Sequence, residues 1–110
     1  MTARSALAVP PNPLNNPGLP NLGCETLQKS GDGGIDSIDL TIWNTDSPTR
    51  RIYWLDFDGA KQFMGNVERG QSSSWKTYHD HVWLIEDETN RCIVLYKIGT
   101  EKSEAILIPH

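Results

Sequence analysis

The sequence has little basic charge and no long hydrophobic run. Its 110 residues include 10 Lys and Arg against 14 Asp and Glu, which gives a net charge of −4. Nucleic acids and anionic membranes bind basic surfaces, so this balance argues against both as partners. Its apolar stretches are far shorter than the roughly 20 residues of a membrane-spanning helix, which argues against such a helix.

Cysteine is scarce as well. Cys24 and Cys92 are the only two, and they form neither a Cys-x-x-Cys motif nor the closely spaced ligand pairs of a zinc site. The two thiols can pair in an oxidising compartment or stay free in a reducing one, and the sequence favours neither state. If they pair, the bond ties the N-terminal part of the chain to a distant strand.

The signatures of the common enzyme classes are missing. The sequence has no nucleophile elbow and no glycine-rich phosphate loop, and Cys92 lies in an apolar segment, where a thiol is usually inert. A metal site built on His79 and His81 needs a third ligand. The remaining histidine, His110, is terminal. We therefore predict a protein without catalytic residues, metal or cofactor.

The first 34 residues differ in composition from the rest. Five of the seven prolines lie between Pro10 and Pro20, among Asn and Gly residues. This stretch has neither a helical nor a strand period, which is typical of extended or disordered chain. The segment KSGDGG (Lys29–Gly34) then indicates a flexible loop. We predict an irregular, proline-rich lead over residues 1–34 and a folded domain over residues 35–110.

From Ile35 onward the sequence has the pattern of short strands. Apolar residues alternate with polar ones in Ile38–Ile42, which predicts a half-buried strand. Further strand patterns cover residues 50–57, 62–64, 75–78, 81–85, 91–98 and 105–109. Turn signals separate them at residues 44–48, 58–59, 69–74, 86–90 and 99–104. About seven short strands, with turns at intervals of roughly eight to twelve residues, predict an all-β sandwich or barrel.

Strand parity suggests which side chains share a face, because successive residues point to opposite faces. We expect the core to receive Leu55, Phe57, Val82 and Leu84. An outer surface then receives Trp54, His81 and Trp83. Indole walls suit a flat, rigid proline ring, and a histidine with Thr77 offers a donor and an acceptor for a hydroxyl on that ring. Alternatively, the tryptophans are ordinary core residues.

Two motifs resemble a known family. WLDFDG (Trp54–Gly59) and YHDHVWL (Tyr78–Leu84) are similar, with the same spacing between them, to the W-L-x-F-D-G and S-Y-x-x-H-x-W-L motifs of the von Hippel–Lindau β-domain family. The resemblance covers Asn44–Asp87 and implies a β-sandwich that binds 4-hydroxyproline in an extended peptide. In the family a separate helical domain recruits elongin C and a ubiquitin ligase. This sequence has no counterpart of that domain, so no elongin-type recruitment is expected.

The resemblance also implies a set of pocket residues. Trp54 and Trp83 match the two pocket tryptophans of the family. His81 matches the histidine that contacts the hydroxyl of hydroxyproline, and Thr77 stands where a serine contacts the same group. Tyr78 matches a tyrosine beside the pocket. The implied ligand is therefore an extended peptide that carries 4-hydroxyproline.

Two positions depart from the family pattern. Met64 replaces a tyrosine that hydrogen-bonds the ligand backbone, and Lys76 replaces a histidine. We predict a non-catalytic peptide- or protein-binding module for proline or 4-hydroxyproline. Its predicted peptide-binding residues are Trp54, Met64, Thr77, Tyr78, His81 and Trp83. One alternative is an interaction scaffold that keeps the fold without binding hydroxyproline. The other alternative is a small metal-binding or enzymatic domain.

Overall fold

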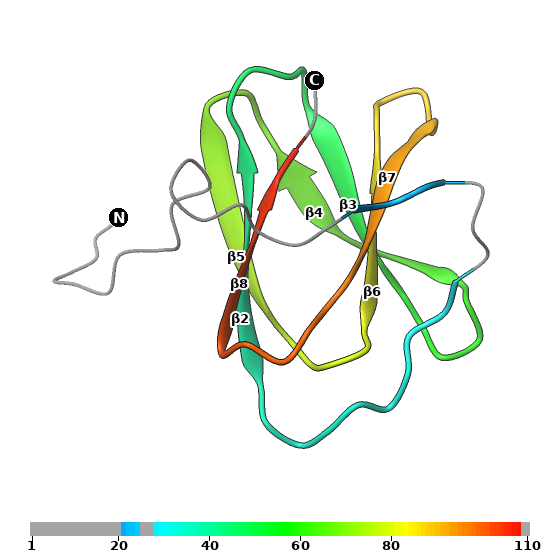
Figure 1. Ribbon diagram of the computed structural model, residues 1–110. Coiled ribbons are helices and arrows are strands. Elements are labelled where there is room, and N and C mark those ends of the chain that lie inside the picture. Colours follow the sequence, from blue (N-terminus) through cyan, green and yellow to red (C-terminus); the bar gives the residue numbers. More distant parts are fainter. Residues whose placement is uncertain (1–20, 25–27, 109–110) are drawn as a thin grey trace, which may run out of the picture.

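The computed structural model describes residues 21–24 and 28–108 and is built from β-strands in two layers (Figure 1). The eight strands are β1 (Asn21–Leu22), β2 (Ile38–Asn44), β3 (Arg50–Leu55), β4 (Lys61–Val67), β5 (Gln71–Thr77), β6 (Val82–Glu86), β7 (Cys92–Lys97) and β8 (Ser103–Leu107). The described residues include no helix, so the predicted all-β sandwich class is confirmed. Within the same residues, no helix is long and apolar enough to cross a membrane.

The strands divide into a five-stranded sheet, in the order β1-β7-β6-β3-β4, and a three-stranded sheet, in the order β5-β2-β8. All pairings are antiparallel except that of β2 with β8, which is parallel. β4 and β5 follow one another in sequence but form edges of different sheets. The chain therefore changes layer at the turn between them, where the Gly70 amide donates to the Asn44 carbonyl at 2.6 Å.

The main core lies between the two sheets. Its buried members are Ile38, Leu40, Ile42, Ile52, Val67, Trp83, Ile85, Val94, Tyr96, Ile98, Ile106 and Ile108. The register explains this set, because directly paired residues share a face: Ile52 is opposite Ile85, and Trp54 is opposite Trp83. The side of β6 that carries Trp83 and Ile85 therefore faces the three-stranded sheet.

Strand alternation therefore predicted the wrong direction for side chains of β6 and for Phe57 after the end of β3. Trp83, expected on an outer surface, is only 1 % exposed in the main core, and Phe57, expected in the core, is 50 % exposed. A second apolar cluster lies on the opposite face of the five-stranded sheet and contains the buried residues Leu55, Val82, Leu84 and Leu95. Because side chains on both faces of this sheet are buried, both alternating sets of residues are apolar, and alternation does not distinguish inner from outer.

Residues before position 35 help to cover that second cluster. β1 pairs with β7, where Leu22 lies opposite Leu95, and Leu22 packs against the second cluster. Cys24 and Cys92 form a disulfide with a Cα–Cα distance of 6.1 Å. The pairing that the sequence left open is thus formed, and it joins β1 to the start of β7. Of the irregular lead predicted over residues 1–34, residues 1–20 and 25–27 lie outside the described residues.

The loop predicted at Lys29–Gly34 has no regular structure but is attached to the sheet. The buried hydroxyl of Ser30 accepts the Val82 amide at 2.8 Å and donates to the Leu55 carbonyl, so it bridges β6 and β3. Gly33 lies so close to the turn between β5 and β6 that a Cβ there would be 1.9 Å from the His79 carbonyl oxygen. Only glycine permits this approach of the two backbones.

β5 lies partly where the sequence indicated a loop, over residues 69–74. β5 pairs with β2 along its full length, with Ser72, Ser73 and Ser74 opposite residues 41–43. The Ser74 hydroxyl lies 3.0 Å from the Thr41 hydroxyl. Strand propensity depends strongly on such neighbours, and pairing with β2 supplies the backbone hydrogen bonds that the local sequence does not predict. The loop prediction was wrong there because the determining partner is distant in sequence.

The hairpin turn predicted at Asp58–Gly59 is confirmed between β3 and β4. The Asp56 carboxylate accepts the amides of Asp58 and Ala60, each at 2.9 Å, and Gly59 has φ of +87°. Asp87 repeats this arrangement between β6 and β7, accepting the amides two and four residues later at 2.8 and 3.0 Å. Both turns are set by an aspartate side chain that bonds to its own following backbone.

Candidate functional site

Three aromatic rings surround His81 just before β6. The centroid of the imidazole lies 5.3 Å from that of Trp54, 5.7 Å from Phe57 and 5.4 Å from Tyr78. Trp54 and Phe57 also contact each other edge to face, with centroids 5.6 Å apart. We call Trp54, Phe57, Tyr78 and His81 the aromatic cluster. Phe57 is 50 % exposed, and the other three are partly exposed, so the cluster is open to solvent.

Three separate elements position these side chains. Trp54 comes from β3 and Phe57 from the Asp56 turn, whereas Tyr78 and His81 begin and end the turn from β5 to β6. In that turn the His81 amide donates to the Tyr78 carbonyl at 3.1 Å, and Asp80 adopts a left-handed φ of +67°. Aspartate tolerates this conformation better than most residues. The turn from β5 to β6 carries the chain from the three-stranded to the five-stranded sheet. The same turn therefore places His81 at the edge of the sandwich.

Two indole N–H groups are bonded to the polar side chains of the site. Trp54 Nε1 donates to His81 Nδ1 at 3.1 Å, and Trp83 Nε1 donates to Thr77 Oγ1 at 2.9 Å. The Thr77 hydroxyl lies 3.4 Å from the same Nδ1. Because an indole nitrogen is only a donor, His81 Nδ1 must be the acceptor. The imidazole is therefore neutral, with its proton on Nε2.

The environment of His81 favours the neutral form. Burial lowers the pKa of His81 below its ordinary value of 6.5, and the carboxylates of Asp32 and Asp80 oppose this effect. Desolvation disfavours the charged imidazole. Protonation at Nδ1 would in addition place two donors, the Trp54 N–H and the new N–H, against each other. The direction of the pKa shift and the hydrogen bond therefore agree.

The structure brings five of the six predicted binding residues together: Trp54, Thr77, Tyr78, His81 and Trp83. Two of them, Thr77 and Trp83, are each only 1 % exposed and form the layer beneath the cluster. Met64 is the extra residue of a bulge in β4 and is 38 % exposed. Among the described residues it makes no hydrogen bond to the other five.

Sequence reasoning missed Phe57 as a site residue and assigned it to the core. A local signal was present, because Phe57 immediately precedes the Asp58–Gly59 turn signal. A residue at that point has left the strand, so strand parity no longer decides its direction. The Asp56 turn directs its ring toward Trp54 and His81 instead.

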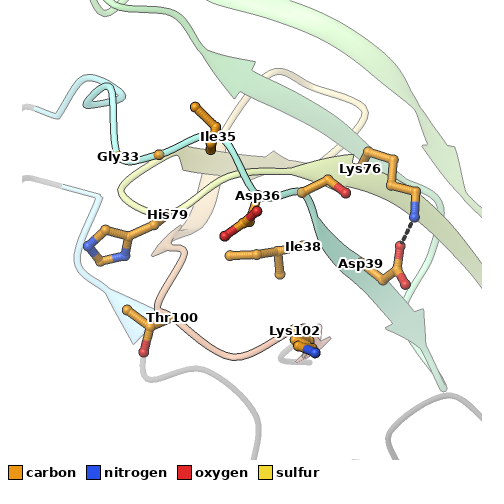
Figure 2. Close-up of a pocket in the computed structure, with 11 residues that line it drawn as sticks. Gly33, Ile35, Asp36, Ile38, Asp39, Lys76, His79, Thr100 and Lys102 are labelled. Carbon is orange, nitrogen blue, oxygen red and sulfur yellow. Dashed lines mark hydrogen bonds and ion pairs between the residues drawn. The ribbon is translucent and has the colours of Figure 1, made fainter.

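A separate groove lies beside His79, with a volume of about 710 Å³ (Figure 2). Its wall includes Lys76, one of the two positions that depart from the family pattern, and Lys76 pairs there with Asp39. Lys102 and Asp36 add one further charge of each sign. The groove therefore has no dominant charge that would attract a charged ligand.

The two histidines of the Tyr78–His81 turn have different surroundings. His79 lines the groove, where its Nδ1 lies 3.0 Å from the Gly99 carbonyl oxygen, whereas His81 bonds to Trp54. The described residues contain no group of three His, Cys, Asp or Glu side chains that could hold a metal ion.

Neither a protein-family model nor a curated protein sequence matches this chain. All four residues of the aromatic cluster belong to the two sequence motifs, Trp54–Gly59 and Tyr78–Leu84.

Proposed function

We propose that this chain is a non-catalytic peptide-binding module of the von Hippel–Lindau β-domain type. Its binding surface is the aromatic cluster, and its ligand is an extended peptide that contains proline or 4-hydroxyproline. The observation that carries the proposal is the set of three partly exposed rings within 5.3 to 5.7 Å of one imidazole.

The chemistry of the cluster suits such a ligand. Proline-rich segments adopt an extended conformation before binding, so docking them on aromatic surfaces costs little conformational entropy. Trp54, Phe57 and Tyr78 supply apolar ring surface from three different elements. His81 supplies a polar group, because its Nδ1 is occupied by Trp54 and, among the described residues, no hydrogen bond engages its Nε2–H. One donor amid aromatic rings can orient a peptide carbonyl without requiring a charged ligand.

A titration with a short proline-containing peptide tests this function. We expect saturable changes in the amide signals of the aromatic cluster and in tryptophan fluorescence. Phe57→Ala should weaken binding about fivefold or more, because it removes one wall of the cluster. The matched control is Phe63→Ala on β4, whose ring is 59 % exposed and contacts Tyr53 instead. Absent saturation, or equal weakening by both variants, would contradict the proposal.

A second candidate is the scaffold that binds a protein partner elsewhere. Phe63 and Met64 are exposed apolar residues on β4, and β4 is the edge of the five-stranded sheet. Exposed apolar groups on an unpaired edge are typical of protein contacts. Binding of a protein partner that Phe63→Ala abolishes and Phe57→Ala spares would favour this function over peptide binding.

A further inference from the structure

The two groups that the family resemblance assigns to reading a ligand hydroxyl are already engaged within this protein. The Thr77 hydroxyl accepts the Trp83 indole N–H at 2.9 Å, and His81 Nδ1 accepts the Trp54 indole N–H at 3.1 Å. A neutral imidazole has a single acceptor nitrogen, so Trp54 occupies the lone pair to which a ligand hydroxyl would donate. Thr77 is in addition only 1 % exposed.

We infer that the aromatic cluster binds unmodified proline, and that hydroxylation of the proline adds no affinity. This inference rests on the proposed function and concerns the ligand class of the same surface. Ring contacts hold the proline, and the Nε2–H of His81 donates to a carbonyl of the peptide backbone. Proline and 4-hydroxyproline both present that carbonyl, so the polar contact does not distinguish them.

The alternative arrangement requires breaking a bond that the structure shows. For a ligand hydroxyl to donate to His81 Nδ1, Trp54 must give up its acceptor. For it to reach Thr77, the ligand must penetrate to a hydroxyl that is buried beneath the cluster and already bonded to Trp83. A bond to His81 Nδ1 therefore replaces an existing one, and a bond to Thr77 requires access to a buried hydroxyl, so the net gain from the ligand hydroxyl is small.

The decisive variant is Trp54→Phe. Phenylalanine retains an aromatic ring but lacks the N–H donor, so the lone pair of His81 Nδ1 becomes free to accept a ligand hydroxyl. We expect this variant to acquire a preference of about three- to tenfold for hydroxyproline, the effect of one added hydrogen bond. The matched control is Trp75→Phe, because Trp75 contacts Trp83 and not His81. It should leave the ratio unchanged.

The experiment titrates two peptides, identical except for proline or 4-hydroxyproline, into the wild type and both variants. Dissociation constants within about threefold of each other for the wild type support the inference. Imidazole ¹⁵N shifts report the tautomer independently of any ligand, and we expect the proton on Nε2. A wild-type preference for hydroxyproline of tenfold or more, or a proton on Nδ1, overturns the inference and leaves the proposed function standing. Failure of both peptides to bind overturns both.

Discussion

Trp83 and Trp54 lie opposite each other on β6 and β3, and each donates its indole N–H to one polar side chain, Thr77 or His81. The Trp83–Thr77 pair is buried, and both side chains are 1 % exposed. The Trp54–His81 pair is partly exposed, and burial lowers the pKa of its acceptor, His81, below the ordinary value. An indole N–H that donates to a polar side chain thus occurs once in the buried core and once at a partly solvent-exposed surface.

Among these tests, removal of the buried Trp83 ring should have the largest effect on the free energy of unfolding. Trp83→Ala leaves a cavity in the main core, and we expect a loss of about 3–5 kcal/mol in the free energy of unfolding. Trp54→Ala should cost clearly less, because its ring is already partly solvated. Urea denaturation of both variants measures the difference. Equal losses would mean that the two tryptophans do not differ in role.

The disulfide provides a test from the other face of the five-stranded sheet. Replacing Cys24 and Cys92 together by serine should lower the free energy of unfolding by about 2–4 kcal/mol, because the unfolded chain gains conformational freedom. The second apolar cluster, against which Cys92 packs, should be affected more than the aromatic cluster. Amide signals of Trp54 and His81 that stay in place confirm this separation, and large shifts there would contradict it.

Thr77→Val tests the inner hydrogen bond without changing the size of the side chain. The variant leaves the Trp83 N–H buried without an acceptor, and we expect a loss of about 1–3 kcal/mol. Thr77→Ser keeps the hydroxyl and should recover most of that loss. Trp54→Phe removes the indole N–H that donates to His81. This variant should change the free energy of unfolding by less than Thr77→Val. A Thr77→Val variant as stable as the wild type would contradict this order.

The smallest expected effect is the pH dependence that His81 gives to the free energy of unfolding. Burial holds the pKa of His81 in the folded protein below the ordinary value of 6.5. The unfolded chain therefore takes up a proton first as the pH falls. The stabilisation from neutral His81 is present above about pH 6.5 and is lost as the pH falls through the unfolded and then the folded pKa. NMR titration should show the lowered pKa, and Trp54→Phe should raise it. A pKa of His81 above 6.5 would contradict the assigned hydrogen bond.

The sequence by itself determined the all-β class and the local turns. Asp56 and Asp87 bond to amides only two and four residues away, so the signal for each turn lies within the turn. The two motifs also contain all four residues of the aromatic cluster, and their resemblance to a known family pointed to three of them, Trp54, Tyr78 and His81.

Only the tertiary structure decided which way the site faces and what it has available for a ligand. Side chains on both faces of the five-stranded sheet are buried, so the alternation of β6 fixed a period but not whether Trp83 or Val82 points into the main core. The bond from Trp54 to His81 joins residues 27 positions apart. Such a contact depends on the pairing of β3 with β6, and for that reason the occupied acceptor of His81 could not be predicted from the sequence.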